Sequence, residues 1–60
     1  MQTVKIVFTD GKTEYIPCES YEYIGDYKMF FVLTKEKRIM IPREQVKIIG
    51  YVNFKEGGYL

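Results

Sequence analysis

The sequence contains no histidine and no tryptophan, and its only cysteine is Cys18. A single cysteine cannot form an internal disulfide, and without histidine the chain lacks an ordinary ligand set for zinc. Nucleophilic catalysis needs a base beside the nucleophile, and neither Cys18 nor Ser20 has a histidine to activate it. We therefore expect no enzyme activity, no metal and no cofactor, and we interpret Cys18 as a small core residue.

Long apolar runs and strong net charge are also missing. No stretch of 18 apolar residues occurs, which excludes a membrane-spanning helix. The N-terminus runs into an alternating segment without the apolar core of a signal peptide, so we expect a complete small protein. The lone cysteine then points to a reducing cytoplasm. The net charge of +1 gives little support to nucleic-acid binding, because such domains are usually strongly basic.

Apolar and aromatic residues are plentiful. The 60 residues are 47% hydrophobic and 17% aromatic, with six tyrosines and four phenylalanines. A chain this short buries only about 60% of the surface that its unfolded form exposes, so it is marginally stable alone. Without a disulfide or a metal, the remaining aids are a well-packed core and association with another subunit.

The first third of the chain predicts a β-hairpin. Residues 4–9 alternate with period two, and Asp10-Gly11 is a strong hairpin signal. A two-residue loop would place Ile16 opposite Lys5, whereas a three-residue loop with Gly11 in the left-handed region places it opposite Val4. The second register gathers the apolar residues of both strands on one face, and we favour it. Pro17 has no N–H group, which predicts an edge or a bulge.

The middle of the chain predicts a second hairpin after a short break at Glu19-Ser20. Residues 21–24 read as a strand, and Gly25-Asp26 fits a two-residue turn with glycine first. That turn would pair Tyr21 with Phe30 and Tyr23 with Lys28. The next strand, residues 27–34, is apolar on both faces at 29–33. Such a run predicts a central strand that is covered on both sides or faces a partner.

The last third predicts a charged loop at 35–37, a strand at 38–41, a helical turn at 42–45 and a strand at 46–52. In the last strand, period two would put Val46, Ile48, Gly50 and Val52 on one face. A helix over 42–49 is the competing interpretation, which the β-branched residues and Gly50 disfavour. We expect one β domain at 1–52 and a flexible tail at 53–60.

This pattern predicts an all-β fold with five short antiparallel strands, in a small barrel or a strongly bent sheet. The run Arg38 to Ile48, a strand followed by a helical turn and a final strand, resembles the end of SH3-like barrels, including the Sm type. The tight first connection at Asp10-Gly11 departs from signalling SH3 domains, and the Arg-Gly motif of Sm proteins is missing. If the barrel does not close, edge-to-edge dimerisation would protect its edges.

The aromatic content favours a protein-binding function. Tyrosine, phenylalanine, methionine and arginine are enriched at interfaces, and so small a chain can scarcely build two cores. We expect a homo-oligomer, a dimer first, or a complex with another protein. In size and style the chain is similar to small bacteriophage proteins, many of which inhibit a host protein. The expected interface residues are Tyr15, Tyr21, Tyr23, Tyr27, Phe30, Arg38 and Arg43.

A nucleic-acid-binding barrel is the alternative. Its phosphate contacts would come from Lys35, Lys37, Arg38, Arg43 and Lys47, with aromatic side chains stacking on bases. Acidic residues sit among these basic ones and weaken the local field. A solvated charged loop that discourages aggregation explains the same residues, and we favour that interpretation.

Overall fold

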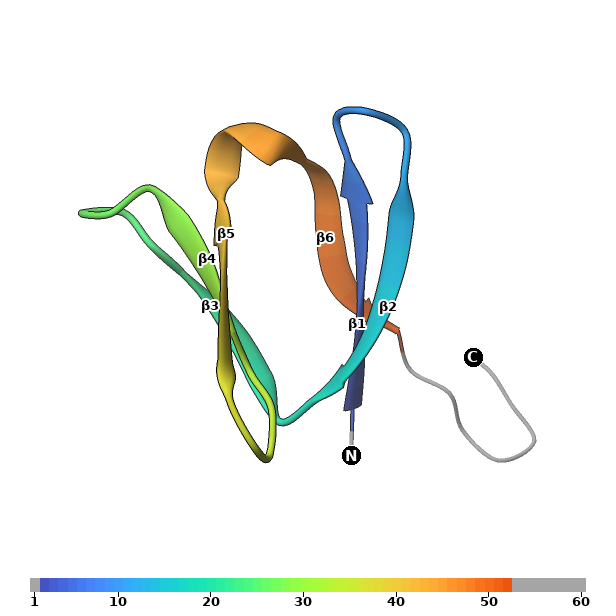
Figure 1. The fold of residues 1–60 in the computed structure, drawn as a ribbon, viewed down its shortest axis with the longest axis vertical. Coiled ribbons are helices and arrows are strands. Elements are labelled where there is room, and N and C mark those ends of the chain that lie inside the picture. The colour runs from blue at the N-terminus through green and yellow to red at the C-terminus, as the bar shows by residue number, and fades with distance from the viewer. Residues whose placement is uncertain (1, 53–60) are drawn as a thin grey trace.

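The computed structural model describes residues 2–52, and the predicted tail at 53–60 lies outside the described residues. The described chain consists of antiparallel strands and one short 3₁₀ turn, which confirms the all-β prediction. The elements are β1 (Gln2–Phe8), β2 (Thr13–Cys18), β3 (Ser20–Ile24), β4 (Met29–Leu33), β5 (Arg38–Pro42), η1 (Arg43–Gln45) and β6 (Val46–Val52). They form two three-stranded sheets, ordered β2-β1-β6 and β3-β4-β5 (Figure 1).

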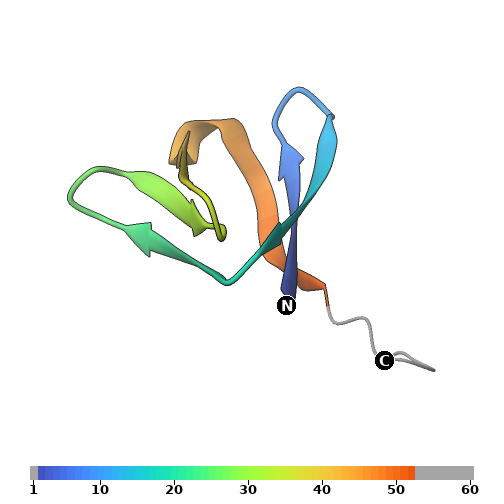
Figure 2. The same cartoon turned by 60° about the horizontal axis from the view of Figure 1, so that its bottom comes forward.

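A single residue, Glu19, carries the chain from one sheet to the other. It lies between the end of β2 and the start of β3, where the chain turns sharply (Figure 2). Its N–H donates to the carbonyl oxygen of Leu33 at 2.8 Å, which ties the bend to the second sheet. Counting β2 and β3 as one bent strand gives the five strands expected, although the structure has six. The two sheets do not close into a barrel.

The β1–β2 hairpin has the predicted register. Val4 lies opposite Ile16, and the loop has three residues, with Gly11 at φ +94°. The Asp10 side chain accepts the Lys12 N–H at 2.9 Å and holds the loop closed. Pro17 lies on β2, an outer strand of its sheet, as its missing N–H predicted.

The predicted turn between β3 and β4 is wrong by two residues. The connection has four residues, 25–28, and pairs Tyr23 with Phe30 and Ile24 with Met29. A two-residue turn would need positive φ at Gly25, but the left-handed residue is Lys28, at φ 54°. The Lys28 carbonyl oxygen accepts the Arg43 N–H at 3.0 Å, so η1 stabilises the longer connection. A shift of two residues leaves every side chain on its predicted face.

The segment after β5 is a turn followed by a strand, and the competing helix over 42–49 is wrong. Pro42 precedes the 3₁₀ turn η1, and β6 begins at Val46 as predicted. The predicted face of β6 needs correction, because a β-bulge adds one residue to this strand. Val7 lies opposite Ile48, but Phe8 lies opposite Val46. Val46 and Ile49 therefore pack against the core, and Ile48 is 57% exposed.

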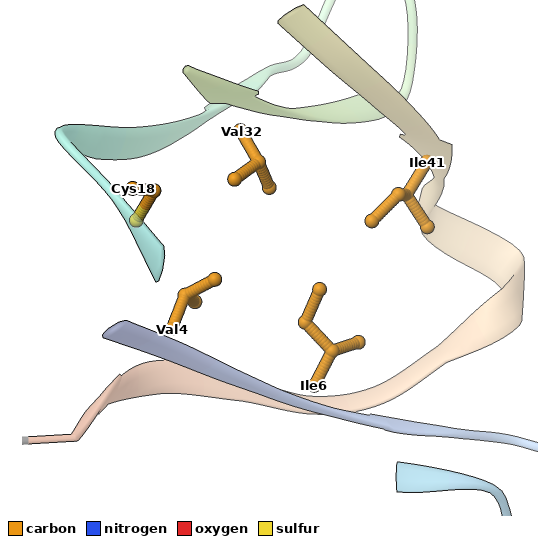
Figure 3. Packing of buried hydrophobic residues seen from close by; sticks show 5 residues of the cluster. All are labelled: Val4, Ile6, Cys18, Val32 and Ile41. Atoms are coloured by element: carbon orange, nitrogen blue, oxygen red, sulfur yellow. The ribbon is translucent and has the colours of Figure 1, made fainter. Parts of the chain in front are cut away.

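The core lies between the two sheets and is small. Its five buried side chains point toward one another from four strands (Figure 3). They are Val4, Ile6, Cys18, Val32 and Ile41. Half-buried apolar side chains from both sheets surround them. At one end, the Tyr51 hydroxyl accepts the Tyr21 N–H at 3.0 Å, and the two rings pack with centroids 4.7 Å apart. This contact links β6 to β3.

Gly11 provides a test of the first hairpin. We expect Gly11→Ala to lower the free energy of unfolding by about 1 kcal/mol, because an L side chain is disfavoured in the left-handed region. Urea denaturation followed by circular dichroism measures the change. Gly50→Ala is the matched control, since its added Cβ meets open space and its φ is ordinary. Equal losses in both variants would contradict the three-residue loop.

Candidate protein-interaction face

The candidate site is the face of the β3-β4-β5 sheet that points away from the core, called the outer face below. Alternation along each strand defines it. On β4, Phe30 and Val32 pack inward, so Met29, Phe31 and Leu33 lie on the outer face. The register adds three residues from β3 and three from β5: Ser20, Glu22, Ile24, Arg38, Met40 and Pro42.

The outer face leaves apolar side chains in contact with solvent. Met40 is 56% exposed and Leu33 is 41% exposed, and Phe31 and Ile24 are half-buried. The predicted two-sided apolar strand is thus confirmed as β4, the central strand of its sheet. One of its sides faces the core, and no strand of residues 2–52 packs against the other.

The outer face is hollowed beside Phe31. The hollow has a volume of about 340 Å³ and is lined by Ser20, Glu22, Ile24, Tyr27, Phe31, Leu33 and Arg38. The Tyr27 ring, 68% exposed, packs against Phe31 with centroids 6.3 Å apart. The Arg38 guanidinium lies over the Phe31 ring, 5.9 Å from its centroid. Phe31 is therefore the centre of the face.

The structure divides the seven predicted interface residues among different surfaces. Tyr27 and Arg38 lie at the rim of the outer face. Arg43 lines a neighbouring hollow of about 350 Å³ together with Tyr27 and Met29. Three of the seven therefore lie on or beside the outer face.

The other four predicted residues lie elsewhere. Tyr21 and Phe30 are half-buried and pack against the core, so they do not lie on the outer face. The Tyr23 ring packs against Phe30 in a tilted arrangement, with ring centroids 5.0 Å apart, and stays 44% exposed. Tyr15 lies opposite Lys5 on the other sheet, and the ammonium group is 6.0 Å from its ring centroid.

Composition alone missed the apolar members of the outer face, Phe31, Leu33 and Met40. The signal for two of them was present in the apolar run at 29–33. Residue type alone does not distinguish Phe30 from Phe31, whereas the alternation of strand β4 decides which of the two reaches solvent. The sequence also does not predict the contact of Tyr51 with Tyr21, because only the folded chain brings β6 near β3.

Within residues 2–52, the predicted phosphate contacts do not gather into one patch. Lys35, Lys37 and Arg38 lie at the loop between β4 and β5. Arg43 lies at the opposite end of this hairpin, hydrogen-bonded through its N–H to Lys28. The loop itself is well fixed, because the Thr34 hydroxyl accepts the Lys37 N–H at 3.0 Å and donates to the Lys37 carbonyl oxygen at 2.9 Å.

Cys18 is buried and lies at the end of β2, beside the bend. Burial raises the pKa of its thiol, and a backbone hydrogen bond with Val4 opposes this only in part. Both facts describe an unreactive core residue. Within residues 2–52, no three cysteine or acidic side chains converge as metal ligands would. The same residues contain no helix of a length and apolarity suited to crossing a bilayer.

Comparison of the chain with family models, with curated proteins and with solved structures finds no match. The resemblance to SH3-like barrels therefore stays a prediction. The outer face itself is the basis on which a function can be argued.

Cys18 yields a pH-dependent prediction. Its folded pKa is raised, so the unfolded thiol ionises first as the pH rises above about 8.5. The contribution of Cys18 to stability is then present below that pH and is lost above it. We expect the unfolding free energy of the wild type to fall relative to Cys18→Ala between about pH 8 and pH 10, measured by urea denaturation.

At neutral pH, Cys18→Ala should lower the unfolding free energy by only about 1 kcal/mol. It should leave the binding of a protein partner to the outer face unchanged. Iodoacetamide should label Cys18 at least about 100-fold more slowly in the folded protein than in urea, because the buried thiol is rarely ionised or accessible. Rapid labelling of the folded protein, or loss of binding in a folded Cys18→Ala variant, would contradict the structural role.

Proposed function

We propose that this protein is a non-catalytic protein-binding module that contacts another polypeptide through the outer face. The observation that carries the proposal is the uncovered apolar side of β4 and its neighbours, centred on Phe31. Burying exposed apolar surface is the main favourable term in protein association. A partner that covered Phe31, Leu33 and Met40 would gain this term.

The composition of the outer face supports this proposal. Its centre is an aromatic ring, and Tyr27, Met40 and Arg38 surround it. These four residue types are enriched in the buried centres of interfaces. We assign Phe31 the role of anchor, with Tyr27 and Arg38 at the rim, because the centre of an interface is desolvated most completely.

The mode of action that we propose is steric: the module covers part of a partner and so blocks it. The small size and the similarity in style to bacteriophage proteins suggest inhibition of a host protein in a reducing cytoplasm. Nucleic-acid binding receives less support, because the candidate phosphate contacts of residues 2–52 lie at both ends of the β4–β5 hairpin. The experiment below distinguishes it from protein binding.

The test compares two aromatic side chains on different sheets. Phe31→Ser should weaken partner binding by at least about tenfold, since truncating a central anchor costs more than about 1.4 kcal/mol. Tyr15→Ser, which removes an exposed ring from the other sheet, should leave binding within about twofold of the wild type. The measurement is capture from a nuclease-treated host lysate, followed by titration of the purified partner and of its activity.

A second variant guards against a folding defect at Phe31. Met40→Glu changes a side chain that is 56% exposed, so circular dichroism should show an unchanged fold while binding is lost. Partner capture that survives both outer-face variants would overturn the proposal. Capture from an untreated lysate that is absent from the nuclease-treated lysate would instead identify a nucleic-acid-binding protein.

A further inference from the structure

The outer face carries one acidic and one basic side chain, and they lie on opposite edges. The pairing registers place its residues in rows across the sheet. Glu22 on β3, Phe31 on β4 and Met40 on β5 form the middle row. Ser20, Leu33 and Arg38 form the next row. The two charged residues thus start from opposite edges and adjacent rows, and the Arg38 guanidinium reaches back over the Phe31 ring of β4.

We propose that a second copy of this chain covers the outer face, related to the first by a twofold axis parallel to β4. The inference rests on the proposed function, since both use the outer face, and a heterologous partner would displace the second copy. Packed sheets lie about 10 Å apart. Rotation about this axis leaves each β4 residue facing its own equivalent. Leu33 then lies opposite Leu33, and Phe31, with the Arg38 guanidinium over its ring, lies opposite Phe31 of the second copy.

Charge complementarity selects this arrangement. The rotation places β3 of one copy over β5 of the other, so that Arg38 lies one row away from Glu22 of the second copy. The Arg38 side chain already leans over the Phe31 ring, toward the row that contains Glu22. The symmetry forms the pair twice. A twofold axis across the strands would instead stack Glu22 on Glu22, which like-charge repulsion disfavours.

The size of the face sets the expected affinity. Three strands spaced about 4.8 Å apart, with five residues each at about 3.4 Å per residue, give a footprint of roughly 15 by 17 Å. Stable interfaces bury about 800 Å² on each partner, so this face falls in the class of small, transient interfaces. We therefore expect a dimer with a dissociation constant in the micromolar range.

Charge exchange between two copies tests the geometry. Glu22→Arg and Arg38→Glu should each weaken the homodimer by about tenfold, because each variant places two like-charge pairs across the interface. An equimolar mixture of the two variants should form a heterodimer with an affinity within about threefold of the wild type, since every pair across it is again of opposite sign. Sedimentation equilibrium from about 1 to about 500 µM, in about 50 mM salt, measures both effects.

The controls reverse exposed charges outside the outer face. Lys47→Glu on β6 and Glu14→Arg on β2 should dimerise as the wild type does. Circular dichroism of each variant verifies the fold. Raising the salt to about 1 M should narrow the difference between the single variants and the wild type, because exposed charge pairs are screened.

Three outcomes would overturn the inference. A wild type that stays monomeric at every concentration would do so, and the proposed function would still stand if Phe31→Ser abolished partner capture. A dimer that neither charge reversal nor Phe31→Ser weakens would place the contact elsewhere, for example at a sheet edge. Single variants that dissociate but do not recombine on mixing would exclude the axis parallel to β4.

Discussion

The structure depends on the burial of a handful of apolar side chains between two sheets. The chain is too short to cover both faces of each sheet, so its one core uses one face of each. Val4 and Ile6 from the first sheet meet Val32 and Ile41 from the second, with Cys18 beside the bend. The outer sides of the same strands also carry apolar side chains, and part of that apolar surface stays in contact with water, which is unfavourable.

The two outer sides differ because their central strands differ. On β1, the residues that point away from the core include Lys5, whose ammonium group lies near the Tyr15 ring. The long apolar stem of such a side chain covers part of this surface without a partner, although Ile48 on the same side is 57% exposed. On β4, the corresponding residues are Met29, Phe31 and Leu33, and the charges lie only at the edges of the sheet. The outer face of the second sheet is therefore the surface that we expect a partner to cover.

The sequence predicted local features better than contacts across the fold. Gly11 determines the loop of the first hairpin, because few other residues adopt its backbone conformation, so the register followed. The second connection depends on a hydrogen bond between Arg43 and Lys28, which no local pattern reveals. The bulge at Lys47, which no local pattern reveals either, places Val46 on the opposite face from Ile48, although period two predicts that they share one. The outer face was foreseen as an apolar run, but its individual members required knowledge of which way β4 points.

Pro17 and the extra residue at Lys47 have a consequence for amyloid growth. Cross-β fibrils extend when a strand presents an uninterrupted row of backbone donors and acceptors to an incoming chain. On β2 the row lacks the N–H of Pro17, and on β6 the bulge distorts it and increases the local twist. Both outermost strands of the first sheet are thus poor templates for fibril elongation.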